Sequence, residues 1–274
     1  AINLCYYAKK YDEALLVSQE VSEMATDKAP GNYLVRSNSL SLIVQSLIKL
    51  ENYSEALSYC EENINLLKRH KVDDDGHHLL QALQQYGDIN LSLKNYDLAE
   101  KAYLTCLDNN LEEYNLVILV TNLTQIYNER LEESLRSKNG ELCLEMYYKA
   151  IDLFKSYPNA DPGSSMYFSP FSNRLKDILS IIPQEEITRL CDNIIDLDLL
   201  VNGSKSAMGA NSEIHPLEWH ATVIQCIALH FREMEYWSEA ILYHDKAIEF
   251  VIENNTHHWG STLRNYYTDR AITK

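Results

Sequence analysis

The sequence has few of the residues that break helices. It contains 8 Gly and 6 Pro among 274 residues, which is too few for a β protein built from many turns. No apolar run approaches the roughly 18 residues of a membrane helix, and no signal peptide is visible. The chain begins with Ala1, so we expect a processed or excised N-terminus. A hydrophobic content of 46% supports a continuous core, and these properties together predict an all-α protein.

Basic residues are also scarce. Lys and Arg number 24 against 40 Asp and Glu, which gives a net charge of −16. An acidic surface repels phosphates, so nucleic acid and anionic membranes are not expected partners. A neutral or basic protein segment is the expected partner. The alternative is that the charge serves only solubility.

The cysteines do not form a recognisable metal or redox motif. None of the six belongs to a C-x-x-C pair, and each lies in an apolar helical pattern. This distribution predicts small core residues of a reducing compartment, and therefore a cytoplasmic protein. The six are Cys5, Cys60, Cys106, Cys143, Cys191 and Cys226.

The sequence also lacks motifs for catalysis or for binding a cofactor. No phosphate-binding loop, dinucleotide fingerprint or nucleophile elbow is present. His77 and His78 are adjacent, so on a helix their side chains point about 100° apart and do not converge on a metal. The run from Asp73 to Gly76 lacks the other ligands of a calcium loop. We therefore expect no metal, no cofactor and no catalytic residue in this chain.

A repeat is present instead. Tyr11, Tyr53 and Tyr96 lie 42 and 43 residues apart, and each is followed three residues later by Ala. Trp237 precedes Ala240 in the same way, and Gly140 occupies the place of the aromatic residue 44 residues after Tyr96. Apolar residues at three- and four-residue spacing on both sides of each aromatic residue predict a pair of amphipathic helices per repeat.

The residues from Leu80 to Asp108 resemble a tetratricopeptide repeat (TPR), as do those from Glu235 to Phe250. The period of 42–44 residues exceeds the usual value of about 34 and is similar to the long-helix variants of kinesin light chains and bacterial peptide-pheromone receptors. The resemblance implies a right-handed α-solenoid of antiparallel helix pairs, with twelve to thirteen helices expected in this chain. Small residues, namely Ala56, Gly87, Ala99 and Ala240, should lie where helices cross closely.

The repeat pattern divides the chain into three parts. Residues 1–157 should form TPR-like repeats, the first of them truncated, and residues 215–274 a further repeat and the start of another. Residues 158–214 lack the motif and predict a degenerate helix pair, with Pro183 at the start of its second helix. Ser, Gly and Asn from Asn202 to Asn211 predict a flexible loop.

The resemblance also implies that the first helix of each pair lines a concave groove. That face is rich in carboxamides, which can both donate to and accept from the backbone of an extended peptide, with Asp88 and Glu129 as charge-reading members. Ser41, Gln81 and Gln85 stand where a clamp for an acidic tail would need cations, so that role is not expected. A merely solvated helix face is the alternative, and residues 158–214 are a reserve site. The predicted partner-binding residues are Gln45, Gln84, Asp88, Asn122, Gln125, Asn128, Gln225 and Arg232.

These observations predict a protein- or peptide-binding solenoid of a larger cytosolic protein, acting as a scaffold or a ligand sensor, whose partners include the remaining domains of the same polypeptide. One alternative is a regulator of the bacterial peptide-pheromone-receptor type. Another is the sensor arm of a STAND NTPase or of a TPR-linked caspase-like protease, with the catalytic domain outside this chain.

Overall fold

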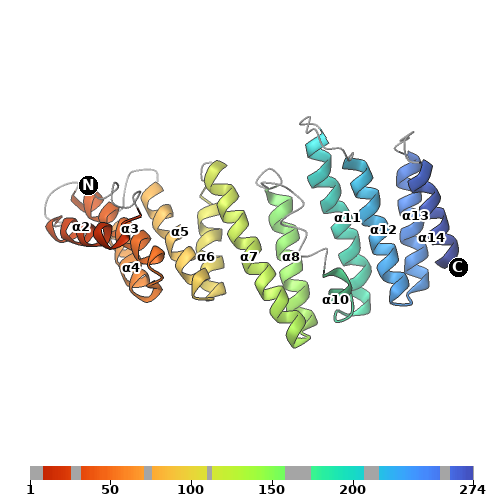
Figure 1. Cartoon of the computed structure of the whole chain (residues 1–274), viewed down its shortest axis with the longest axis horizontal. Coiled ribbons are helices and arrows are strands. Elements are labelled where there is room, and N and C mark those ends of the chain that lie inside the picture. Colours follow the sequence, from red (N-terminus) through yellow and green to blue (C-terminus); the bar gives the residue numbers. More distant parts are fainter. Residues whose placement is uncertain are drawn as a thin grey trace. The chain divides into compact units, whose positions relative to one another are not determined.

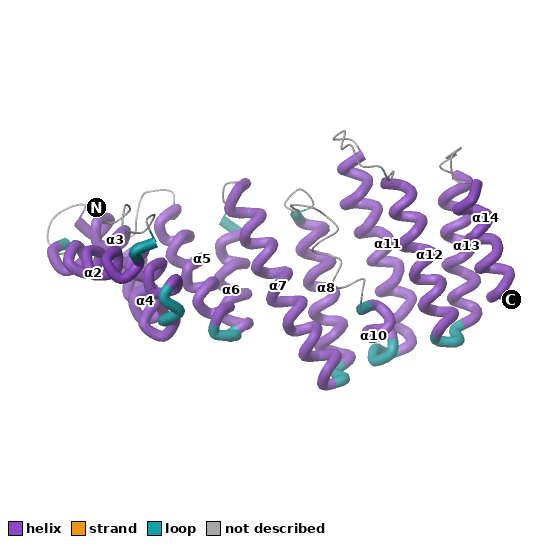
Figure 2. The backbone as a smooth tube through the Cα atoms, in the orientation of Figure 1, coloured by secondary structure: helices purple, strands orange, loops and turns teal. Residues whose placement is uncertain are grey.

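The computed structural model describes residues 9–25, 32–70, 76–109, 113–157, 174–206, 216–253 and 260–273. Within these ranges it contains twelve helices and no strand, so the predicted all-α fold is confirmed (Figure 2). The chain forms two compact units, residues 1–126 and 127–274. The helix α7 (Glu113–Ser137) runs from one unit into the other.

In the first unit each described helix packs on the next one along the chain, and α3 also contacts α5 (Figure 1). The repeat predicted the helix starts correctly, because Tyr11, Tyr53 and Tyr96 are the first residues of α2, α4 and α6. Helices α4 and α6 are each the second member of a described hairpin, formed with α3 and α5 respectively. The helices are α2 (Tyr11–Met24), α3 (Asn32–Lys49), α4 (Tyr53–His70), α5 (His77–Ser92) and α6 (Tyr96–Leu107).

Four of the described hairpin turns, at Glu51, Lys94, Lys138 and Glu235, share one backbone geometry. After α3, the Glu51 N–H donates to the Ile48 carbonyl at 3.1 Å and the Asn52 N–H donates to the Leu47 carbonyl at 2.9 Å. This is the Schellman arrangement, in which the residue after the helix adopts a left-handed conformation. That residue is usually glycine, but here it is always charged. The left-handed residues are Lys9, Glu51, Lys94, Lys138 and Glu235, with φ between 53° and 64°.

Small residues lie at the helix crossings, as predicted. Ala56, Ala99 and Ala240 are fully buried, and Gly87 is buried on α5. Where Gly140 replaces the aromatic residue, Cys143 takes the place of the alanine and is also fully buried. A larger side chain at such a buried position is expected to overpack, because protein interiors are packed to the density of organic crystals.

The second unit repeats the same arrangement. Helix α8 contacts α11, and α11, α12, α13 and α14 pack in chain order (Figure 1). Tyr243 on α13 donates to Asp192 on α11 at 3.0 Å, so the second helices of neighbouring pairs also touch. The helices are α8 (Gly140–Ser156), α10 (Leu175–Leu179), α11 (Gln184–Ser206), α12 (Pro216–Glu233), α13 (Trp237–Glu253) and α14 (Gly260–Thr273).

The segment between α10 and α11 explains why Gly140 lacks a side chain. A Cβ added at Gly140 would lie 2.3 Å from the Ile181 carbonyl oxygen, so backbone occupies the space that a side chain at this position would need. Pro183 immediately precedes α11, as predicted. The predicted loop from Asn202 is wrong in its first part, because α11 continues to Ser206. A single glycine inside a helix costs only about 1 kcal/mol relative to alanine, so Gly203 does not end it.

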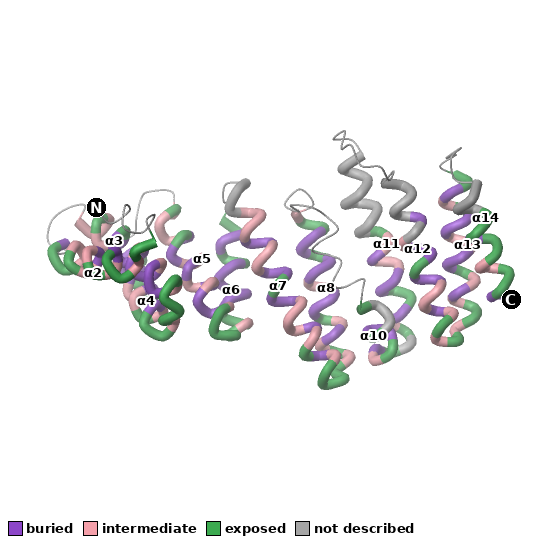
Figure 3. Tube along the Cα trace, in the orientation of Figure 1, coloured by how far each residue is buried: buried purple, intermediate pink, exposed green. Residues whose placement is uncertain are grey.

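Buried residues recur along the helices of the hairpins (Figure 3). Trp237, the aromatic residue of its repeat motif, is an exception, because it is 48% exposed. The ring of its neighbour Tyr236 packs edge-on against Phe231, with 6.3 Å between the ring centroids.

Cys60, Cys106, Cys143 and Cys191 are buried and free. Cys226 is free but exposed, so its predicted core position is wrong. Cys5 lies outside the described residues.

Candidate functional site

The seventh residue after the start of each second helix is fully buried, and its side chain is always one with a polar or polarisable atom. We call this the joint position. Two of these residues, Tyr103 and His244, connect three helices by hydrogen bonds, namely their own helix, the preceding one and the following one. The residues at the joint position, seven residues after the first residue of α2, α4, α6, α8, α11 and α13, are Ser18, Cys60, Tyr103, Tyr147, Cys191 and His244.

The Tyr103 joint contains two of the predicted partner-binding residues. The Tyr103 hydroxyl on α6 donates to Asp88 Oδ1 on α5 at 2.7 Å. The Asn122 amide on α7 donates to the same Oδ1 at 3.1 Å and lies 3.1 Å from the Tyr103 hydroxyl. Asp88 and Asn122 are partly buried, and Tyr103 is fully buried. The structure therefore brings Asp88 and Asn122 together, with their polar groups joined to each other.

Burial controls the electrostatics of this cluster. It raises the pKa of Asp88 to about 6, although the hydrogen bond from Tyr103 acts in the opposite direction. Burial is also the main cause that raises the pKa of the Cys60 thiol to about 12 and that of Cys106 to about 11, with the Asp88 charge adding to both. At pH 7 the thiols are thus neutral, and Asp88 carries the charge of the cluster.

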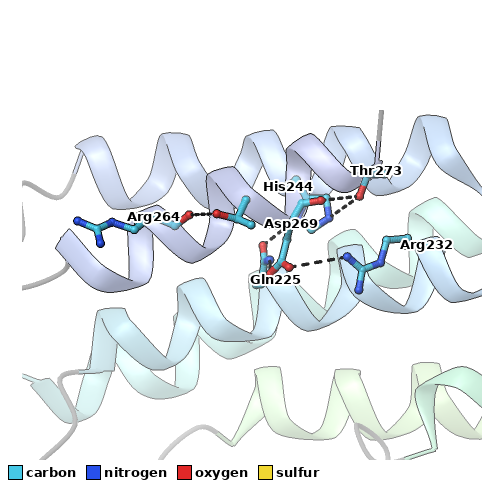
Figure 4. A network of polar contacts seen from close by, with 7 residues as sticks. Gln225, Arg232, His244, Arg264, Asp269 and Thr273 are labelled. Carbon is cyan, nitrogen blue, oxygen red and sulfur yellow. Dashed lines mark hydrogen bonds and ion pairs between the residues drawn. The ribbon is translucent and has the colours of Figure 1, made fainter.

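The second joint lies in the other unit, around His244 (Figure 4). His244 Nδ1 is 3.0 Å from Gln225 Oε1 on α12, and Nε2 is 3.2 Å from the Thr273 hydroxyl on α14. Gln225 also donates to Asp269 Oδ2 at 2.9 Å, and Arg232 lies 3.7 Å from Asp269 Oδ1. Because an amide oxygen only accepts, Nδ1 must carry a proton. Burial lowers the pKa of His244, so the ring is neutral at pH 7.

Both units use one register to connect neighbouring first helices. Gln85 on α5 donates to the Ser41 hydroxyl on α3 at 2.7 Å, and Gln225 donates to Asp269; in both pairs the partners are 44 residues apart. In the first unit, the Gln85–Ser41 bond places α5 beside α3, and the Asn122–Asp88 bond places the Glu113–Ile126 part of α7 beside α5. We call these three segments the first-helix layer.

The predicted partner-binding residues differ in how exposed they are. On the first-helix layer, Gln45 and Gln84 are partly exposed, and Gln125 is exposed. Gln225, at 5% exposure, and Arg232 are engaged with Asp269 in the second unit. Asn128 is partly buried and belongs to the second unit. Their role in binding a partner stays a prediction.

Sequence reasoning missed Tyr103, His244, Asp269 and Thr273 as members of polar clusters. A usable signal was present for the first two, because both lie seven residues after the start of a second helix. The positions of Asp269 and Thr273 on α14 carry no such signal. Their contacts depend on which side of α14 faces α12 and α13, and the apolar pattern of that helix is weak.

The described residues contain no group of His, Cys, Asp and Glu side chains that could hold a metal ion. In the same ranges, no helix combines the length and apolarity needed to cross a membrane.

No protein-family model and no curated protein matches the chain. Solved structures similar to it include the TPR2AB domain of yeast Sti1 in complex with pHSP90, at 14% identity over 98% of this chain and 95% of that one, with a TM-score of 0.36. The C-terminal part of a TPR repeat-containing protein from Cytophaga hutchinsonii shows 13% identity over 100% and 94%, with a TM-score of 0.35.

The nuclear import adaptor Nro1, a hypoxic regulator of sterol synthesis, shows 11% identity over 96% of this chain and 93% of that one, with a TM-score of 0.40. All three scores lie below 0.5, so the fold is assigned from this chain's own helix hairpins, left-handed turns and motif residues. The fold is TPR-like.

Proposed function

We propose that the chain is a cytoplasmic protein-binding module that holds an extended segment of a partner along the first-helix layer. The observation that carries this proposal is the row of carboxamides on three neighbouring helices, of which Gln125 is exposed and Gln45 and Gln84 are partly exposed. A carboxamide donates and accepts at once, as the backbone of an extended peptide also does. The proposed role is binding rather than catalysis.

The dimensions of the layer suit an extended segment. Packed helices lie about 8–10 Å apart, and an extended chain advances about 3.3 Å per residue. A bound segment crossing the layer would therefore meet a new helix about every three residues. Three helices would contact a segment of roughly six to nine residues, which is long enough for several backbone hydrogen bonds.

The net charge of the chain favours some partner segments over others. The net charge of −16 favours encounter with neutral or basic partners and disfavours acidic ones. Ser41, Gln81 and Gln85 of the layer are polar but uncharged. An acidic tail would therefore find no counter-ion at these positions. The proposed partner is accordingly a neutral-to-basic protein segment.

The test begins with selection of binding peptides from a random phage-displayed library against the full chain. The selected peptides are then titrated against wild type and against a triple variant, Gln45→Ala, Gln84→Ala and Gln125→Ala. Each lost hydrogen bond should weaken binding by about 0.5–1.5 kcal/mol. The matched control removes three exposed polar groups from second helices, by Ser58→Ala, Asn65→Ala and Thr105→Ala. Equal affinity of the triple variant and wild type would place the binding site elsewhere.

A further inference from the structure

We infer that Asp88 receives one cationic group of the bound segment, the side chain of a lysine or an arginine, and that Tyr103 and Asn122 position the carboxylate for it. The inference rests on the proposed function, because it assigns a specificity to the same surface. It goes beyond that function by naming the residue that recognises the partner and the kind of side chain that it recognises.

The hydrogen bonds of Asp88 leave half of its carboxylate without a donor. Both donors in the cluster, the Tyr103 hydroxyl and the Asn122 amide, are neutral and converge on Oδ1. Among the described residues, the side-chain contacts of Asp88 are these two hydrogen bonds to Oδ1, so Oδ2 accepts no hydrogen bond and Asp88 forms no ion pair. A partly buried carboxylate without a counter-ion is costly, because charges removed from water are normally paired. A cation supplied by a partner would remove that cost.

The other ionisable groups of the cluster supply no positive charge. Those that interact with Asp88 are Cys60 on α4 and Tyr103 and Cys106 on α6, and all three have a raised pKa and are neutral at pH 7. On the neighbouring first helices, Ser41 of α3 and Asn122 of α7 are uncharged. The carboxylate therefore lies among neutral groups, where a single cation has a large effect.

The position of Asp88 fits the proposed binding surface. Asp88 lies one helical turn after Gln84, and residues four apart share a face of a helix. A segment held through its backbone by Gln84 would thus place one of its side chains beside Asp88. Tyr103 is fully buried, and its ring packs against Gly87, which limits how far the hydroxyl can follow a displaced carboxylate. The arrangement is preorganised for a ligand at one point.

Protonation should compete with the cation. Because burial raises the pKa of Asp88 to about 6, the carboxylate is mostly ionised at pH 7 and only about one-tenth ionised at pH 5. A bound cation favours the ionised form, so binding releases a proton wherever Asp88 is still protonated. Affinity should therefore fall about tenfold between pH 7 and pH 5 if the contact is made.

The experiment uses peptides selected from the random library, and synthetic versions in which each lysine is replaced by norleucine and each arginine by citrulline. Calorimetric titration of the full chain should show one such replacement that lowers affinity at least about tenfold. In Asp88→Asn the same replacement should have little effect, and affinity should no longer change between pH 7 and pH 5. Asparagine keeps an acceptor for Tyr103, so this variant should fold.

Two further variants separate a charge-reading role from a structural one. Tyr103→Phe removes the hydrogen bond that opposes the rise in the pKa of Asp88, so the midpoint of the pH profile should move upward. A purely structural tyrosine would leave that midpoint in place. Glu61→Gln removes one negative charge from an exposed position on α4 and should leave both the cation preference and the pH profile unchanged.

The outcomes distinguish the two proposals. If the carboxamide variant loses affinity but no cationic side chain matters, or if Asp88→Asn keeps the wild-type pH profile, the inference about Asp88 is overturned and the proposed function stands. If no peptide is selected, both are overturned. If replacing a cationic side chain of the peptide lowers affinity equally in wild type and in Asp88→Asn, another carboxylate binds that side chain and the inference is again wrong.

Discussion

The ring of Tyr103 occupies the space beside Gly87. A Cβ added at position 87 would lie 2.5 Å from Cε1 of that ring, which is closer than real carbon atoms approach. In an ordinary helix, alanine stabilises relative to glycine by about 1 kcal/mol. Here we expect Gly87→Ala to destabilise the chain by about 1–3 kcal/mol, because the fully buried ring must move. Urea denaturation measures the change.

The ring can be removed to test the cause. Tyr103→Leu should itself destabilise the chain, but adding Gly87→Ala to it should then cost much less than in wild type. A double-mutant cycle should give a coupling of about 0.5–3 kcal/mol. Additive effects of the two substitutions would show that the strain in Gly87→Ala has another source.

The charged residues at the left-handed turns should be replaceable by glycine with a gain in stability. Lys94 and Glu51 have φ of 60° and 59°, a conformation that costs an L-residue roughly 1–2 kcal/mol. Lys94→Gly and Glu51→Gly should each raise the free energy of unfolding by about 1 kcal/mol. Lys101→Gly, at an exposed position inside α6, should lower it by a similar amount. A loss of stability in the turn variants would contradict the assignment.

Gly140 should be intolerant of a side chain for a different reason. The nearest atom to an added Cβ is the Ile181 carbonyl oxygen, and backbone cannot rotate away as a side chain can. Gly140→Ala should lower the melting temperature, with an expected cost of about 1–3 kcal/mol. Glu141→Ala changes the next, exposed residue and should be nearly neutral. Equal melting temperatures for the two variants would refute the close approach.

The His244 joint should make stability depend on pH. Burial lowers the pKa of His244, with Arg232 and Arg270 acting in the same direction and Asp269 and Asp245 against it. The unfolded chain, with an ordinary pKa of about 6.5, therefore binds the proton more readily than the folded chain. The stability from this group is complete above about pH 6.5 and is lost as the pH falls through the folded-state pKa.

The measurement is the free energy of unfolding of wild type and His244→Gln from pH 7.5 to pH 5. Asp88 contributes a slope of the opposite sign near pH 6, but it does so in both proteins and cancels in the difference. Below pH 6.5 the advantage of wild type should shrink by at most about 1.4 kcal/mol per pH unit. A pH-independent difference would mean that His244 does not titrate there.

The hairpins could be predicted from sequence because their signals are local. The three-residue offset from Tyr53 to Ala56 and from Tyr96 to Ala99 marks the start of a second helix, and the structure begins α4 and α6 at those tyrosines. The turns themselves were not marked, since Glu51 and Lys94 adopt the conformation that glycine normally signals. Intrinsic preference is overridden there by the packing of the two helices against each other.

The polar joints could not be predicted, because they depend on contacts between repeats. The amphipathic pattern of α5 places Asp88 on a polar face, but it does not show that Tyr103, on the next helix, points its hydroxyl at that carboxylate. The sequence likewise predicts Gln225 as a groove residue, and only the position of α14 shows that its amide donates a hydrogen bond to Asp269. The periodicity of a sequence shows which residues share a face of a helix. Which residues of another helix contact that face depends on the tertiary structure.

The variation in size at the joints has a consequence for correct assembly. In the first unit, the bulky Tyr103 faces Gly87, while the small Cys60 shares its core with Val44 on the neighbouring first helix. If α6 paired with α3 during folding, Tyr103 would collide with Val44; if α4 paired with α5 in the manner of α6, a void would remain beside Gly87. Such exchanges between similar neighbours are a characteristic way for repeat proteins to misfold. The mismatched volumes distinguish one hairpin from the next and penalise a domain-swapped product.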